Sequence, residues 1–274
     1  MTHQARLKRA VSRTTAAGVT PASIAWIPHI LWVLYDGLPI IGIVGGIGSG
    51  KSFVARIFGD LGCLVINSDE QVTEVYGLPQ VKATLEQWWG SEVFQPDGTL
   101  NRKQIAARVF ASAHERRRLE ALVHPHVAQL RDMTMQRAAK SPTPPLAFVW
   151  DSPLLFEAGL ADRCDVVVFV EAPSSVRLKR VQETRGWDEA ELARRENSQW
   201  PLDKKQALSH YVVTNAAETP GLCPAPLDPA RHTEVRSPEA AVKSEADDTC
   251  GLRRQVRSVL TRILIAWTGP DGTA

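Results

Sequence analysis

Residues 45–52 read Gly-Gly-Ile-Gly-Ser-Gly-Lys-Ser and match the phosphate-binding loop pattern G-x-x-x-x-G-K-[S/T]. The apolar run 40–44 just before the loop suits a buried parallel strand. The glycines let backbone N–H groups surround phosphate oxygens, and Lys51-Ser52 can open a helix whose N-terminus favours anions. We predict a nucleoside triphosphate site in which Lys51 reaches the β- and γ-phosphates and Ser52 holds Mg²⁺. The residues expected at the nucleotide are Gly45, Gly46, Ile47, Gly48, Ser49, Gly50, Lys51, Ser52 and Phe53.

Two acidic residues follow later apolar runs, at the ends of expected strands. Asp69 comes after the run 63–66, and Asp151 after the run 146–150. Ligands of open α/β sheets bind at the carboxyl ends of the strands, so both carboxylates are expected beside the phosphate loop. Asp69 can accept the proton of an attacking hydroxyl, although capping the next helix fits its position equally well and the two roles are compatible. Asp151 is expected to bind Mg²⁺ directly or through water.

The residues after Asp151 are apolar. Pro153, Leu154, Leu155 and Phe156 can form a wall for a phosphate acceptor, although core packing is the more common role of such a run.

Further along, basic residues gather on two expected helices around Gly186. They are Arg177, Lys179, Arg180, Arg185, Arg194 and Arg195. Any one of these cations is typical of a solvated surface, but the cluster predicts a lid that closes over the transferring phosphoryl group.

Composition restricts the class of protein. The chain has 274 residues and a net charge of +2, too slight to indicate a nucleic-acid partner. Its four cysteines show no metal-binding spacing, which favours a reducing, cytoplasmic setting. The apolar stretch 24–35 contains Pro28 and His29 and is shorter than the ~20 residues of a membrane span. We expect a packed or partner-binding extension, with membrane association as the less favoured interpretation.

From Leu38 onward, strand-like runs alternate with helical periodicities, which predicts an α/β fold with helices on both faces of a parallel sheet. The five strand-like runs are 40–44, 63–66, 146–150, 166–170 and 211–213. The Pro-rich segment 218–249 predicts a flexible insertion. Beyond it, an apolar stripe predicts a terminal helix packed on the core. The expected divisions are an N-terminal extension (1–37), a phosphate-loop domain (38–217), the insertion (218–249) and the terminal helix (250–274).

Taken together, these motifs resemble the dephospho-CoA kinase family. The resemblance covers about 40–217 and the terminal helix. It rests on the phosphate loop, Asp69, Asp97-Gly-Thr-Leu with Arg102, Arg108-Val-Phe, His124-Pro125, Asp151-Ser-Pro-Leu-Leu-Phe-Glu157, Leu178-Lys-Arg180, Arg195 to Gln199, and Tyr211-Val-Val-Thr-Asn215.

The resemblance implies ATP-dependent phosphorylation of the ribose 3′-hydroxyl of dephospho-CoA, the last step of coenzyme A synthesis. It also implies a phosphate-loop kinase fold: a five-stranded parallel sheet with a helical acceptor-binding region (75–138) and a lid (174–208). Asp69 would be the general base, Arg185 a lid cation, and Asn215 would lie near the adenine. The residues implied at the acceptor are Arg102, Arg108, His124, Pro153, Leu154, Leu155 and Phe156.

The chain departs from the family pattern at several positions. Asn67-Ser68 stands where the family usually has Asp-Ala, Phe53 replaces a small Thr, and Asn215-Ala-Ala lacks a glycine. A nucleoside-monophosphate kinase or a shikimate-type kinase would share the loop, the Mg²⁺ and a lid. A GTP-driven switch is disfavoured because a guanine-reading Asn-Lys-x-Asp run is absent. A catalytically silent nucleotide-binding module is disfavoured by the intact Lys51, Ser52 and Asp69. The sequence does not indicate an oligomeric state.

Overall fold

The computed structural model describes Tyr35, residues 37–216 and residues 251–268. The predicted Pro-rich insertion and nearly all of the predicted N-terminal extension lie outside the described residues.

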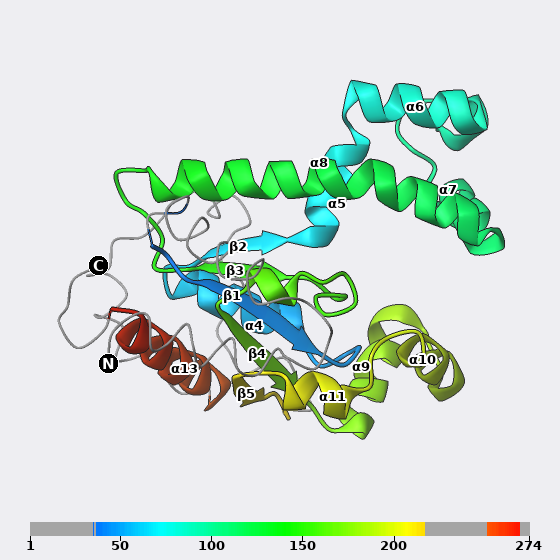
Figure 1. Cartoon of the computed structure of the whole chain (residues 1–274). Helices are drawn as coiled ribbons and strands as arrows, with labels where there is room; N and C mark the ends of the chain where they lie inside the picture. Colours follow the sequence, from blue (N-terminus) through cyan, green and yellow to red (C-terminus); the bar gives the residue numbers. More distant parts are fainter. Residues whose placement is uncertain (1–34, 36, 217–250, 269–274) are drawn as a thin grey trace, which may run out of the picture.

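Five parallel strands form one sheet in the order β2-β3-β1-β4-β5 (Figure 1). Their bounds are β1 Ile40–Gly45, β2 Leu64–Asn67, β3 Phe148–Asp151, β4 Val166–Glu171 and β5 Tyr211–Thr214. Each predicted apolar run overlaps its strand to within two residues at either end. The central strand β1 is buried along its whole length, which is why it reads as a continuous apolar run.

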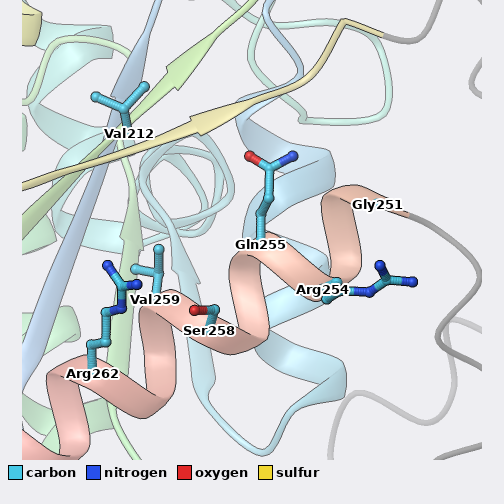
Figure 2. A pocket seen from close by; sticks show the side chains of 7 residues that line it. All are labelled: Val212, Gly251, Arg254, Gln255, Ser258, Val259 and Arg262. Atoms are coloured by element: carbon cyan, nitrogen blue, oxygen red, sulfur yellow. The ribbon is translucent and has the colours of Figure 1, made fainter.

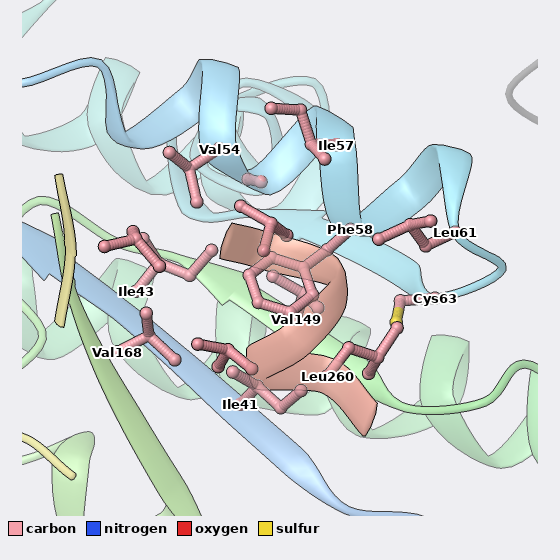
Figure 3. Close-up of a cluster of buried hydrophobic side chains, with 14 of the residues drawn as sticks. Ile41, Ile43, Val54, Ile57, Phe58, Leu61, Cys63, Val149, Val168 and Leu260 are labelled. Carbon is pink, nitrogen blue, oxygen red and sulfur yellow. The ribbon is translucent and has the colours of Figure 1, made fainter. Parts of the chain in front are cut away.

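Helices cover both faces of the sheet. On one face, α4 (Lys51–Asp60) and α13 (Gly251–Thr268) pack on side chains such as Ile41, Val149 and Val168 (Figure 3). On the other face, the last turns of α8 (Ala113–Ala139) contribute Met135 and Ala139 to a second cluster. Alternate residues of the strands supply the two clusters, as the period of a pleated strand requires.

A helical region extends away from the sheet beyond β2 (Figure 1). It consists of α5 (Ser68–Tyr76), α6 (Pro79–Trp89), the short helix η1 (Ser91–Val93), α7 (Arg102–Ala111) and the first half of α8. These elements share their own core, in which Val75, Val81, Leu85 and Val93 are completely buried. The region therefore has a hydrophobic core of its own, separate from the two clusters of the sheet.

Three helices connect β4 to β5: α9 (Ser174–Arg185), α10 (Glu189–Glu196) and α11 (Leu202–Ala207). A short helix, η2 (Ala161–Arg163), precedes β4. Side chains cap two of the helices: Ser112 accepts from the N–H of Glu115 at the start of α8, and Asp188 accepts from that of Glu191 at the start of α10. Pro201 lies just before α11, at its N-cap.

The terminal helix α13 lies along the edge strand β5. Its stripe of Leu252, Val256, Val259, Leu260 and Ile263 is buried. Gln255 accepts a hydrogen bond from the Thr214 backbone N–H at 2.9 Å, so this side chain covers part of the exposed sheet edge. A hollow of about 490 Å³ lies between α13 and β5, and no residue of the phosphate loop lines it. Its lining residues are Val212, Gly251, Arg254, Gln255, Ser258, Val259 and Arg262 (Figure 2).

Among the described helices, none combines the length and the apolar character that crossing a membrane requires.

Candidate active site

The phosphate loop connects the carboxyl end of β1 to the first turn of α4. Gly48 and Gly50 have φ values of 76° and 88°, in the left-handed region that favours glycine. A Cβ atom on Gly48 would lie 2.7 Å from the carbonyl oxygen of Arg177, so any larger residue would clash with backbone. No side chain caps α4 at Gly50, and the backbone N–H groups of Lys51 and Ser52 at the start of the helix can therefore bind an anion.

Lys51 folds back over this loop. Its Nζ donates hydrogen bonds to the carbonyl oxygens of Gly45 at 3.1 Å and Gly46 at 3.0 Å. Burial lowers the pKa of Lys51 from 10.5 to about 8; Asp151 opposes this shift, and the cations Lys205, Arg185 and Arg177 add to it. The ammonium group therefore lies in a positive environment that an arriving phosphate would neutralise.

Asp69 lies at the start of α5, where β2 ends. It is exposed, and its backbone N–H donates to the side chain of Asn67 at 2.9 Å. Asn67 also accepts from the N–H of Glu70, so Asn67 is the N-cap of α5. The alternative that Asp69 caps this helix is wrong, because the helix begins at Ser68 and places Asp69 inside its first turn. The Asp69 carboxylate is thus not engaged as the cap.

Asp151 is the last residue of β3 and is only 4% exposed. In the sheet it pairs in register with Ile43 of β1 and Asn67 of β2, which places its backbone between the phosphate loop and the start of α5. Ser52 is exposed in the first turn of α4. A hydroxyl and a carboxylate are hard oxygen donors of the kind that Mg²⁺ prefers. No cluster of three or more His, Cys, Asp or Glu suited to a metal occurs in the described part of the chain.

Two arginines of α9 donate hydrogen bonds to the backbone of the phosphate loop. Arg177 donates to the Ile47 carbonyl at 3.3 Å and forms an ion pair with Glu196 of α10. Arg180 donates to the carbonyl oxygens of Gly48 and Ser49, both at 3.1 Å. The sequence grouped these two arginines with the lid cations, but their hydrogen bonds support the backbone of the loop instead.

Asn215, just after β5, completes this support. It is 6% exposed, and its side-chain amide donates to the Ser49 carbonyl at 2.8 Å. Its Oδ1 and its backbone oxygen each accept from Arg180 at 3.1 Å. Asn215 therefore links the end of the last strand to the loop that follows the first.

The expected lid cations gather around one aromatic ring. The guanidinium groups of Arg185 and Arg195 lie 4.7 and 4.0 Å from the ring centre of Trp187. Glu191 forms ion pairs with Arg195 at 2.6 Å and Arg194 at 2.7 Å. Arg185 itself is exposed, and it is close enough to Lys51 to affect the pKa of that residue.

The segment around α11 contacts the loop that follows β3. Lys205 is 1% exposed, and its Nζ contacts Glu157 at 2.8 Å and Gln199 at 3.0 Å. The rings of Phe156 and Trp200 stack with centroids 5.7 Å apart. No role was predicted for Lys205, because the partner of a lone lysine cannot be read from the sequence.

The residues expected at the acceptor are not all brought together. Arg102 is exposed and donates to the Thr73 hydroxyl on α5, whereas Arg108 pairs with Glu92 at 2.9 Å. His124 is exposed on α8. Leu155 is completely buried and packs in the core beside the sheet, so its side chain does not reach the surface where an acceptor would bind. Here the core-packing alternative is the correct one, while Leu154 is 45% exposed.

Comparison with known proteins agrees with this arrangement. The family model described as dephospho-CoA kinase matches residues 39–220. The dephospho-CoA kinase of Geobacter metallireducens is 39% identical over 178 residues, which span 64% of this chain and 87% of that protein. The dephospho-CoA kinase of Anaeromyxobacter dehalogenans is 41% identical over 180 residues, 65% of this chain and 83% of the relative.

Among solved structures, TT1252 from Thermus thermophilus superposes with a TM-score of 0.58 at 30% identity, covering 66% of this chain and 90% of that one. The family match extends over the loop, the helical region and helices α9 to α11, from β1 to beyond β5. The chain therefore belongs to the dephospho-CoA kinase family and is a kinase, as its motifs indicated.

Proposed function

We propose that this kinase transfers the γ-phosphoryl group of ATP to the ribose 3′-hydroxyl of dephospho-CoA and so produces coenzyme A. The observation that supports the proposal best is the placement of Lys51, Asp69 and Asp151 at the carboxyl ends of three adjacent strands. This edge holds a phosphate-binding loop, an exposed carboxylate and a buried one. A reducing, cytoplasmic setting is part of the proposal.

Asp69 acts as the general base in this proposal. The 3′-oxygen of the acceptor attacks the γ-phosphorus, its proton passes to the Asp69 carboxylate, and the bond from phosphorus to the bridging oxygen of ADP breaks. Because Asn67 caps α5, the Asp69 carboxylate is not required there and can accept the proton.

Lys51 and the first turn of α4 hold the phosphates of ATP. On binding, the ammonium group exchanges the carbonyl oxygens of Gly45 and Gly46 for phosphate oxygens, which are stronger acceptors. Arg185 moves from the Trp187 ring towards the transferring group as the lid, about 174–208, closes. Asn215 lies near the adenine and keeps the loop in shape.

Ser52 and Asp151 are the residues that would hold Mg²⁺. When bound, the ion would neutralise charge on the β- and γ-phosphate oxygens. Two protein oxygens leave several coordination positions for phosphate and water, which is the usual arrangement for Mg²⁺.

The acceptor is held by the helical region, about 75–138, and by the loop after β3. Arg102 and the exposed Leu154 are the strongest candidates for contact with it, beside Pro153 and Phe156. Arg108 and His124 also belong to the proposal, although Arg108 must first leave Glu92.

A panel of acceptors tests the proposal. The full chain is given ATP and Mg²⁺ with dephospho-CoA, AMP, adenosine or shikimate in separate reactions, and ADP release is followed by a coupled assay. We expect turnover with dephospho-CoA to exceed that with every other acceptor. Preference for AMP or shikimate would indicate one of the other small-molecule kinases, and nucleotide binding without turnover of any acceptor would indicate a silent module.

A further inference from the structure

A basic pocket lies in the helical region, outside the phosphate loop. Its volume is about 630 Å³, and it is enclosed by the second half of α5, the start of α6, the segment before α7 and the first residues of α7. The lining residues that matter here are Thr73, Tyr76, Lys82, Asn101, Arg102 and Lys103. Three of these are cations, and no Asp or Glu lines the pocket within the part of the chain that the structure describes.

None of the three cations forms an ion pair with another described residue. Lys82 donates to the Gly98 carbonyl at 2.9 Å, and Arg102 donates to the Thr73 hydroxyl at 2.5 Å. Asp97 is close enough to Lys82 to be affected by it, but the low pKa of Asp97 comes first from its hydrogen bonds with Thr99. The pocket therefore keeps a net positive charge that favours an anion.

The pocket is connected to Asp69 through one face of α5. The Thr73 hydroxyl donates to the backbone oxygen of Asp69 at 2.8 Å and accepts from Arg102. An α-helix rises 1.5 Å per residue, so Thr73 lies ~6 Å along the helix axis from Asp69. Gly77 also lines the pocket and lies ~12 Å from Asp69 along the same axis. The positively charged pocket thus lies one to two helical turns from Asp69, where the hydroxyl of an acceptor would bind.

We infer that this pocket binds the 5′-diphosphate of the acceptor, with Arg102, Lys82 and Lys103 contacting the phosphate oxygens. The inference rests on the proposed function, because the diphosphate and the reacting 3′-hydroxyl belong to the same ribose. The pocket then acts as a specificity determinant: it favours a nucleotide that carries a diphosphate over a nucleoside or a carboxylic acid with a similar hydroxyl. The half-buried ring of Tyr76 offers an apolar surface beside the phosphates.

The test compares charge removal with charge retention at the two lysines. In the full chain, Lys82→Gln and Lys103→Gln should each raise the KM for dephospho-CoA about tenfold, since a hydrogen bond to a charged group is lost. The kcat and the KM for ATP should stay within about twofold, and Lys82→Arg and Lys103→Arg should restore the KM. Lys140→Gln, at an exposed lysine after α8, is the matched control.

Several results would overturn the pocket assignment. The first is a rise in the KM for dephospho-CoA in both Gln variants that is no larger than the rise in Lys140→Gln. The second is an equal rise in the KM for ATP. The third is a KM for dephospho-CoA that stays high in Lys82→Arg and Lys103→Arg. Failure of the proposed function is distinguishable, because the unaltered chain would then show no turnover of dephospho-CoA. If the unaltered chain turns over dephospho-CoA and the lysine variants have normal kinetics, the pocket does not bind the diphosphate, but the proposed function stands.

Discussion

The side chain of Asn67 accepts a hydrogen bond from the backbone N–H of Asp69 at 2.9 Å, and this contact separates the role of helix cap from that of base. Asn67 stands where the family usually carries an aspartate, and its amide oxygen still caps α5. Asn67 is therefore the helix cap, which leaves the Asp69 carboxylate available for the proposed role of base.

This division gives a prediction for two neighbouring variants. Asp69→Asn should lower turnover by roughly 10²–10⁴ because the proton acceptor is lost, while the melting temperature barely changes. Asn67→Ala should instead destabilise the protein by ~1 kcal/mol through the lost cap. Thermal unfolding and turnover per folded molecule check both variants. Unchanged turnover in Asp69→Asn, together with a lower melting temperature, would make Asp69 structural.

The lowered pKa of Lys51 predicts that the protein takes up a proton when the nucleotide binds. Its pKa of about 8 in the free protein is below the ordinary 10.5, and phosphate anions favour the protonated form and raise it again. Above pH 8 the nucleotide should therefore bind together with a proton, and its affinity should fall as the pH rises through 8. Near neutral pH Lys51 is already protonated before the nucleotide binds, so Lys51 should take up no proton on binding.

Calorimetry in buffers of different ionisation enthalpy measures this uptake. Lys51→Arg is the control, since its guanidinium stays protonated and should remove the effect. Absence of proton uptake by the unaltered chain above pH 8 would show that Lys51 does not meet the phosphates.

Arg180 should matter for ATP although it lies behind the phosphate loop. Arg180→Met removes the hydrogen bonds to Gly48, Ser49 and Asn215, and the loop loses part of its fixed shape. We expect the KM for ATP to rise about tenfold or more, since hydrogen bonds to charged groups contribute ~1.5–3 kcal/mol each. Lys140→Met, at an exposed lysine after α8, is the control. Equal kinetics for the two variants would refute the supporting role.

Two aliphatic residues of the terminal helix should contribute differently to the free energy of unfolding. Leu260 is 4% exposed in the core beneath the sheet, whereas Ile265 is 67% exposed on the same helix. Leu260→Ala should cost ~2–5 kcal/mol of unfolding free energy, and Ile265→Ala should stay within about 0.5 kcal/mol. Denaturant unfolding measures both values. Similar losses in the two variants would mean that α13 does not pack as described.

The family, the fold class and the kinase activity predicted from the sequence are confirmed. The strands were predictable because buried parallel strands appear as short continuous apolar runs. The phosphate loop was predictable because its chemistry requires glycine, lysine and serine at fixed spacing, in order after a strand. Both signals are local in the chain.

The contacts that the sequence did not reveal are long-range. Arg180 and Asn215 reach loop residues 131 and 166 positions away, and only the folded sheet brings them together. Leu155 was ambiguous because the same apolar residue suits a core or an acceptor wall, and its burial decides for the core. The alternative that Asp69 caps α5 was wrong because the helix starts two residues earlier, which makes Asn67 the cap.

The position of the new phosphate in the product is the most direct test of the mechanism. The full chain is incubated with ATP, Mg²⁺ and dephospho-CoA, and the product is analysed by mass spectrometry and phosphorus NMR. The account predicts one added phosphate on the ribose 3′-oxygen, formed at a rate that falls by roughly 10²–10⁴ in Asp69→Asn. Phosphate at any other position, or an equal rate of 3′-phosphorylation in Asp69→Asn, would contradict it.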